Sequence, residues 1–188
     1  MAISTNSIQA FKQNFGGGSR ANRFEIVNTQ SDMWPSGVSV NSNEFYKFYS
    51  SSLPRAEVGT VYVGYRGRTL SLAGDRSYTV WNISIYDDNN TADNLWQAFH
   101  KWKEKLDGHL THKVDKTGAA VGDNYASYKH LQKNWTINQL DINGDEPIRK
   151  IKLINCWPSQ IGGINLDMSS PNQGNFSVTM TFDWFEIL

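Results

Sequence analysis

Residues 64–88 read GYRGRTLSLAGDRSYTVWNISIYDD, and this stretch decides the fold. Glycines stand at turn positions between two runs of strand-forming residues, 60–63 and 69–72, so the sequence predicts a β-hairpin. Ala73-Gly74-Asp75-Arg76 predicts a second turn. The segment is therefore typical of an antiparallel β protein.

Two later stretches alternate as strands with one buried face do. In residues 81–86 the apolar face consists of Trp81, Ile83 and Ile85. In residues 176–184 the apolar face consists of Phe176, Val178, Met180, Phe182 and Trp184. The opposite face of that last strand is small and polar, and consists of Ser177, Thr179, Thr181 and Asp183.

One helix is expected, over residues 91–106, with Asn90 as its N-cap and Gly108 just after its end. Its apolar stripe, expected to pack across the outside of a β-barrel as an outer helix, is Leu95, Phe99, Trp102 and Leu106. Its other face carries His100, Lys101, Lys103 and Lys105. This basic face is interpreted either as a solvated surface or as a docking face for an outer partner.

Shorter strands are expected at 24–27, 45–49, 135–142 and 148–154. Residues 30–43 are expected to form a polar insertion around Trp34-Pro35. Turns are expected at residues 143–146 and at Trp157-Pro158-Ser159. The glycine-rich residues 1–20 are expected to form a flexible N-terminal arm, either a loose tail or a segment that orders on a neighbour, and residues 21–188 a single domain. The expected fold class is mainly β (α+β), an antiparallel β-barrel or sandwich with one flanking α-helix.

The charge balance argues against nucleic-acid binding through phosphates. Lys plus Arg and Asp plus Glu both number 18, so the formal net charge is zero, whereas phosphate-binding proteins carry a basic excess. A net charge near zero instead favours self-association. The first fifteen residues lack the apolar run of a signal peptide, so synthesis and folding in a cytoplasm are expected.

The sequence offers no recognisable catalytic or metal-binding constellation. His109 and His112 have no carboxylate or cysteine partner at a telling distance, and a solvated loop is the better interpretation. The single cysteine, Cys156, cannot form an internal disulfide and is expected to be buried. An enzyme is therefore not expected, and neither are a cofactor, a metal or a membrane span.

The Ala73-Gly74-Asp75-Arg76 corner, the Trp157-Pro158 turn and the alternating last strand resemble the tail-tube proteins of contractile-tailed, T4-like bacteriophages. The resemblance extends from about residue 24 to residue 186. It implies a structural virion protein with a tail-tube or Hcp-like fold. Such subunits are expected to form six-membered rings that stack into a tube inside a contractile sheath, with a channel through which DNA is ejected.

The resemblance also implies partners: other copies of the chain, the tail sheath protein, and baseplate and tail-terminator proteins. DNA is expected to pass without specific binding, and no membrane is expected to be involved. Assembly is expected in the host cytoplasm and the mature location in the phage tail.

Two sets of site residues are proposed. The small, weakly acidic face Ser177, Thr179, Thr181 and Asp183 is expected to line the channel, because a basic lining would retard DNA; the alternative is an ordinary solvent face. In the family the segment matching residues 52–68 lies between successive rings. Its ring-stacking candidates are Tyr62, Tyr65, Arg66 and Arg68, residue types favoured at contact hot spots.

Three alternatives remain open at this point. The first is the tube protein of a related injection machine, such as a tailocin or a type VI-like device. The second is a baseplate protein that starts the tube. The third, from another class, is a monomeric β-sandwich binding module, which would not polymerise.

Overall fold

The computed structural model of the protein describes residues 8–15, 18–27, 33–40, 42–87, 94–116, 126–142 and 146–188. Its helices are α1 (Ile8–Phe15), α3 (Leu95–Leu106) and α4 (Ala126–Lys129), with a 3-10 helix η1 (Ser42–Lys47). Its strands are β1 (Phe24–Val27), β2 (Phe48–Ser51), β3 (Ala56–Tyr65), β4 (Arg68–Tyr78), β5 (Trp81–Tyr86), β6 (Lys133–Leu140), β7 (Pro147–Ile161), β8 (Asn175–Thr181) and β9 (Trp184–Ile187).

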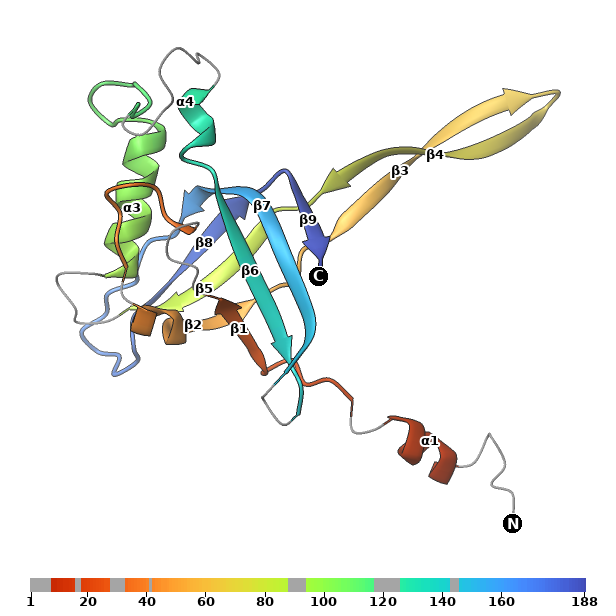
Figure 1. Ribbon diagram of the computed structural model, residues 1–188, viewed down its shortest axis with the longest axis horizontal. Helices are drawn as coiled ribbons and strands as arrows, with labels where there is room; N and C mark the ends of the chain where they lie inside the picture. The colour runs from red at the N-terminus through yellow and green to blue at the C-terminus, as the bar shows by residue number, and fades with distance from the viewer. Residues whose placement is uncertain are drawn as a thin grey trace.

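The body is a seven-stranded antiparallel sheet of order β1-β6-β7-β8-β5-β2, with β9 paired to β7 beside this path. The long strand β7 joins two parts of the sheet, because its first half pairs with β6 and β9 and its last residues pair with β8. It changes partners at Asn155, whose φ of 58° is one that asparagine tolerates. The sheet curls around the core, and α3 lies alongside it (Figure 1). The predicted mainly β fold with a flanking helix is confirmed.

The core is dominated by aromatic side chains. Trp135 lies at its centre, with ring centroids 5.7 Å from Trp81, 5.5 Å from Trp34 and 6.0 Å from Phe99. Edge-to-face and offset pairs of this kind add to the stabilisation from burial. The inward residues of β5 and β8 belong to the same cluster as the buried face of α3. The helix therefore packs against the face of the sheet that points toward the core.

The segment around Trp34 differs from the prediction. Residues 30–43 were predicted to be a polar insertion, but Met33, Trp34, Val38 and Val40 are buried in the core. Residues 30–32 and 41 of that prediction lie outside the described residues. Because these apolar side chains lack strand or helix periodicity, only the tertiary fold reveals that they are buried.

The boundaries of α3 also differ from the prediction. The helix begins at Leu95, and its N-cap is Asn94, whose Oδ1 accepts a hydrogen bond from the Trp96 N–H at 2.7 Å. The predicted cap, Asn90, lies outside the described residues. Leu95, Phe99 and Trp102 are buried and Leu106 is partly buried against them.

The end of α3 does not use the left-handed glycine that was expected. The C-cap, Asp107, is extended, and Gly108 is needed for space instead, because a Cβ there would lie 2.5 Å from Thr111 Oγ1. A side chain at position 108 would therefore push the following loop away from the helix.

Two strand predictions and one turn prediction were wrong in detail. Residues 45–47 belong to η1, so the second strand starts at Phe48. The Trp157-Pro158-Ser159 segment continues β7 instead of turning. The last strand is two strands, β8 and β9, and Trp184 on β9 is exposed instead of buried. Of the turn predicted at 143–146, residues 143–145 lie outside the described part of the chain.

Candidate assembly surfaces

Strands β3 and β4 form a separate two-stranded ribbon that projects far from the body (Figure 1). Arg66 and Gly67 connect the strands with φ values of 47° and 76°. Positive φ at both central residues is the signature of a type I′ turn, whose twist matches that of the flanking strands. Nearly every residue of the two strands is exposed.

The two faces of this ribbon differ in polarity. Val61 pairs with Leu72, Val63 with Leu70, and Tyr65 with Arg68. Because paired residues share a face, the apolar side chains gather on one side. We call this side the apolar ribbon face; it consists of Val61, Val63, Tyr65, Leu70 and Leu72. Each of the five is between 43% and 59% exposed, so the monomer leaves an apolar surface uncovered.

The sequence-predicted stacking residues are divided between these faces. Tyr65 and Arg68 lie on the apolar side, and Arg66 in the turn holds its guanidinium carbon 5.3 Å from the Tyr65 ring centroid. Tyr62 pairs with Ser71 on the opposite, polar face. Sequence reasoning missed the aliphatic members of the face, although the alternation at 61, 63 and 65 was a usable signal.

The predicted turn at 73–76 lies inside β4. The register shifts between Val58 and Thr60, so β4 carries a bulge opposite Gly59. A Cβ on Gly74 would lie 3.2 Å from the Gly59 carbonyl oxygen, which shows how closely the two backbones approach there. The local glycine signal therefore marks a bulge and not a reversal of the chain.

An aromatic cluster joins the stem of the ribbon to the body. The ring centroid of Tyr78, at the end of β4, lies 6.0 Å from that of Phe182 and 5.6 Å from that of Phe185. The Thr79 N–H also donates to the Arg55 carbonyl at 3.1 Å. The ribbon is thus held at its base while its tip extends into solvent.

The face of β5 and β8 that points away from the core is polar and uncharged. Ser177 pairs with Ser84, and Thr179 pairs with Asn82 and donates a hydrogen bond from Oγ1 to Asn82 Oδ1 at 2.9 Å. We call this surface the uncharged face; it consists of Asn82, Ser84, Ser177, Thr179 and Thr181. Three of the predicted channel residues therefore lie together on one strand face.

Asp183 is not part of the uncharged face. It lies between β8 and β9, and its Oδ2 accepts a hydrogen bond from Asn155 Nδ2 at 2.7 Å. The chain bends at Phe182–Asp183, so the alternation of β8 does not continue through this residue.

Strand edges remain available at the ends of the sheet. Among the described residues, β1 pairs only with β6, β2 only with β5, and β9 only with β7. Unpaired N–H and C=O groups on such edges can pair with a strand of another chain.

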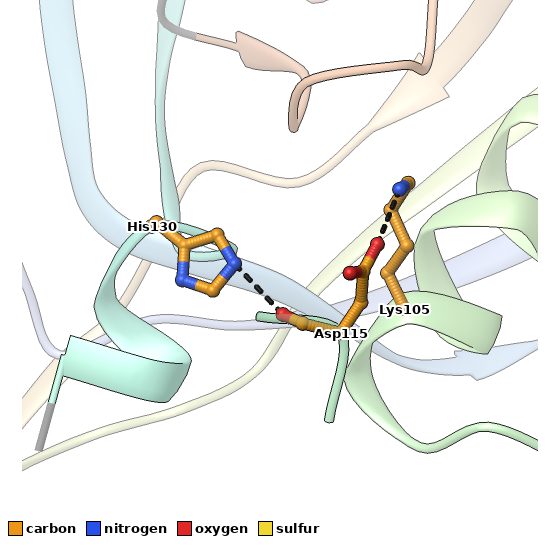
Figure 2. Close-up of polar contacts among 3 residues, drawn as sticks. All are labelled: Lys105, Asp115 and His130. Carbon is orange, nitrogen blue, oxygen red and sulfur yellow. Dashed lines mark hydrogen bonds and ion pairs between the residues drawn. The ribbon is translucent and has the colours of Figure 1, made fainter. Parts of the chain in front are cut away.

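A groove lies beside the C-terminal half of α3, on the core side of the sheet and hence away from the uncharged face. It has a volume of about 990 Å³. We call it the basic groove; its charged lining residues are Lys101, Glu104, Lys105, Lys113, Asp115 and Lys116. Figure 2 shows how it is braced: Lys105 Nζ lies 2.6 Å from Asp115 Oδ2, and His130 Nε2 lies 2.9 Å from the Asp115 carbonyl oxygen.

The basic side of α3 is thus divided. Lys101 and Lys105 line the basic groove, whereas His100 and Lys103 line a separate, smaller pocket with His109 and His112. Partial burial, with a smaller contribution from the positive charge of Lys103, lowers the pKa of His100. The His100 side chain is therefore less readily protonated than a free histidine.

The described residues offer few groups suited to catalysis or metal binding. They contain no cluster of three or more His, Cys, Asp or Glu able to hold a metal ion. Cys156 is buried, and its burial raises the pKa of the thiol, which disfavours the reactive thiolate. No helix among the residues that the structure describes has the length and apolarity to span a membrane.

Comparisons with known proteins agree with this geometry. The sequence pattern of the phage tail tube protein family matches residues 20–188. The tail tube protein gp19 of Enterobacteria phage T4 is 25% identical over 148 residues, which cover 78% of this chain and 83% of that protein. The corresponding protein of phage T6 is 24% identical over the same length and coverage.

Solved structures with the same fold come from an anti-feeding prophage and from an extracellular contractile injection system. A chain of the anti-feeding prophage baseplate has a TM-score of 0.60 at 12% identity, covering 90% of this chain and 95% of its own length. A chain of an extracellular contractile injection system, in its sheath-tube complex, has a TM-score of 0.55 at 12% identity, covering 97% and 98%. The family match over residues 20–188 confirms the resemblance seen in the sequence, and the chain belongs to the phage tail tube protein family.

Proposed function

We propose that this protein is the main subunit of a phage tail tube and assembles into six-membered rings that stack inside a contractile sheath. The observation that carries the proposal is the apolar ribbon face, an uncovered surface on a member of a tube-forming family. The role is structural, with the host cytoplasm as the site of assembly and the phage tail as the final location.

Stacking is assigned to the ribbon. Covering the apolar ribbon face with a neighbouring subunit stabilises the assembly by roughly 25 cal/mol for each Å² removed from water. A contact between two different surfaces of identical subunits repeats without end along an axis. A projecting ribbon on one subunit and a receiving surface on the next therefore produce a filament.

Ring closure is assigned to the free strand edges. Pairing the edge of β2, β1 or β9 with a neighbour would satisfy its backbone groups and extend the sheet around the ring. A closed barrel has no edges, which removes the aggregation hazard that these strands present in the monomer.

The channel wall is assigned to the uncharged face. A lining without positive charge neutralises no phosphates and releases no counterions, so it retards sliding DNA less than a basic wall would. The helix α3 then lies on the outer surface of the tube, because it packs against the core-facing side of β5 and β8, opposite the uncharged face. This places α3 toward the sheath, while baseplate and terminator proteins contact the ends of the tube.

A phage tail is favoured over another injection device or a baseplate protein. The relatives at 25% and 24% identity are tail tube proteins of phages, whereas the chains from the anti-feeding prophage baseplate and the extracellular contractile injection system share 12% identity and the fold.

The decisive variant is Val63→Asp with Leu70→Asp, which places two charges on the apolar ribbon face. Its matched control is Thr60→Asp with Ser71→Asp, which places the same charges on the polar face of the same ribbon. We expect the first variant to remain soluble as rings or monomers in negative-stain images and sedimentation, and the control to form tubes. Tubes from the first variant at wild-type yield would remove the assignment. Compared as unassembled subunits, both should unfold at the wild-type temperature, because the ribbon lies outside the core.

A further inference from the structure

The basic groove beside α3 has an excess of positive charge on a chain whose net charge is zero. Four lysines line it against two carboxylates. The proposed function places this flank of the protein on the outer wall of the tube, and the inference that follows rests on that placement.

Both acidic residues of the groove have a partner within the chain. The Asp115 carboxylate pairs with Lys105, and Glu104 Oε1 accepts a hydrogen bond from the His109 N–H at 2.8 Å. The remaining cations are Lys101, Lys113 and Lys116, whose ammonium groups have no hydrogen-bond or ion-pair partner among the described residues. The groove therefore has a net positive charge toward solvent, although the neutral His109 N–H leaves the negative charge of Glu104 in place.

Hydrogen bonds within the chain brace the loop that lines the groove. The Gly108 N–H donates to the Lys113 carbonyl at 3.1 Å, and the Asp115 N–H donates to the Lys105 carbonyl at 2.9 Å. The His130 ring adds a contact to the Asp115 carbonyl oxygen (Figure 2). Together these contacts tie the loop after α3 to the helix and to the turn that precedes β6. A preformed site loses less conformational entropy on binding than a mobile loop does.

We propose that the basic groove is a docking site for an acidic segment of the protein that encloses the tube. Carboxylates of that segment pair with Lys101, Lys113 and Lys116, and the exposed ring of Tyr128 provides an apolar wall beside them. Charge complementarity selects this occupant, because unpaired ammonium groups attract carboxylates and repel basic partners. Duplex DNA is the competing polyanion, but in the proposed tube it lies on the far side of the core.

The test uses assembled wild-type protein and a fluorescein-labelled peptide of alternating Glu and Ala. Lys101→Glu with Lys113→Glu reverses two groove charges, and Lys103→Glu reverses one charge two residues along the same helix, where side chains do not share a face. We expect the groove variant to weaken peptide binding about tenfold or more and the Lys103 variant by less than about twofold, with affinity falling as salt rises.

The possible results distinguish failure of the docking proposal from failure of the tube proposal. Equal weakening by both variants, or no binding of the peptide by wild-type tubes, overturns the docking site while the tube proposal stands. A DNA duplex that binds more tightly than the peptide and with the same sensitivity to Lys101→Glu and Lys113→Glu also overturns it. Failure of the wild-type protein to form tubes in electron micrographs contradicts the proposed function itself.

Discussion

Asn155 donates a hydrogen bond from Nδ2 to Asp183 Oδ2 at 2.7 Å, across the place where β7 changes partners. Asn155 has a φ of 58°, and the Asp183 N–H donates to the Ile154 carbonyl at 3.1 Å. The bend in β7 and the corner between β8 and β9 are therefore tied together. This link directs β9 back along the first half of β7.

Two substitutions at position 155 separate the side-chain bond from the backbone geometry. Asn155→Gly removes the bond and keeps the left-handed backbone accessible, whereas Asn155→Ala removes the same bond and adds roughly 1 kcal/mol of strain. We expect the free energy of unfolding in urea to be lowest for the alanine variant. An alanine variant as stable as the glycine variant would show that the left-handed conformation is not required.

Trp34 contributes to the stability of the aromatic core. Its ring contacts those of Phe99, Trp102 and Trp135 at centroid distances of 5.0, 5.6 and 5.5 Å. We expect Trp34→Ala to lower the free energy of unfolding by roughly 3–5 kcal/mol, because it leaves a large cavity. Trp34→Phe, which keeps an aromatic ring, should cost distinctly less in the same thermal or urea unfolding experiment. Equal stability of the alanine variant and the wild type would contradict burial of this loop.

The uncharged face can be tested by adding charge to it. Thr179→Lys with Thr181→Lys should leave tube length unchanged and slow DNA release from assembled particles, because lysines on the wall attract phosphates. Thr179→Val with Thr181→Val is the control, since valine has nearly the shape of threonine and no charge. We expect it to release DNA at the wild-type rate, as followed with an intercalating dye. Unchanged release from the lysine particles would place this face elsewhere than on the channel.

Cys156 should resist alkylation in the folded protein. Burial raises the pKa of its thiol, so the thiol stays protonated at neutral pH and the thiolate needed for alkylation is scarce. We expect iodoacetamide to modify Cys156 only after denaturation, as measured by mass spectrometry at pH 8. Rapid labelling of native protein would mean that the β6–β7 pairing opens readily around it.

Strands with a strict period of two were predictable from the sequence. Trp81, Ile83 and Ile85 are buried as their alternation predicts, and so are Phe176, Val178 and Met180. The alternation carries the information locally, because each side chain of a strand points to the opposite face from the next.

Features that depend on a second segment were not predictable. The glycine at position 74 resembles a turn until Gly59 is seen opposite it, and Trp34 resembles a loop residue until α3 and β6 enclose it. Asp183 continues the polar alternation of β8 in the sequence, but its carboxylate is held by Asn155 on β7. In each case the deciding partner is remote in sequence, so no local period reveals it.

The most direct measurement of the central claim is negative-stain electron microscopy of the purified wild-type protein at increasing concentration. The account predicts annular particles with sixfold symmetry and hollow filaments built from them, and it predicts that Val63→Asp with Leu70→Asp abolishes the filaments. A wild-type sample that remains monomeric at high concentration, without rings or hollow filaments, would contradict it.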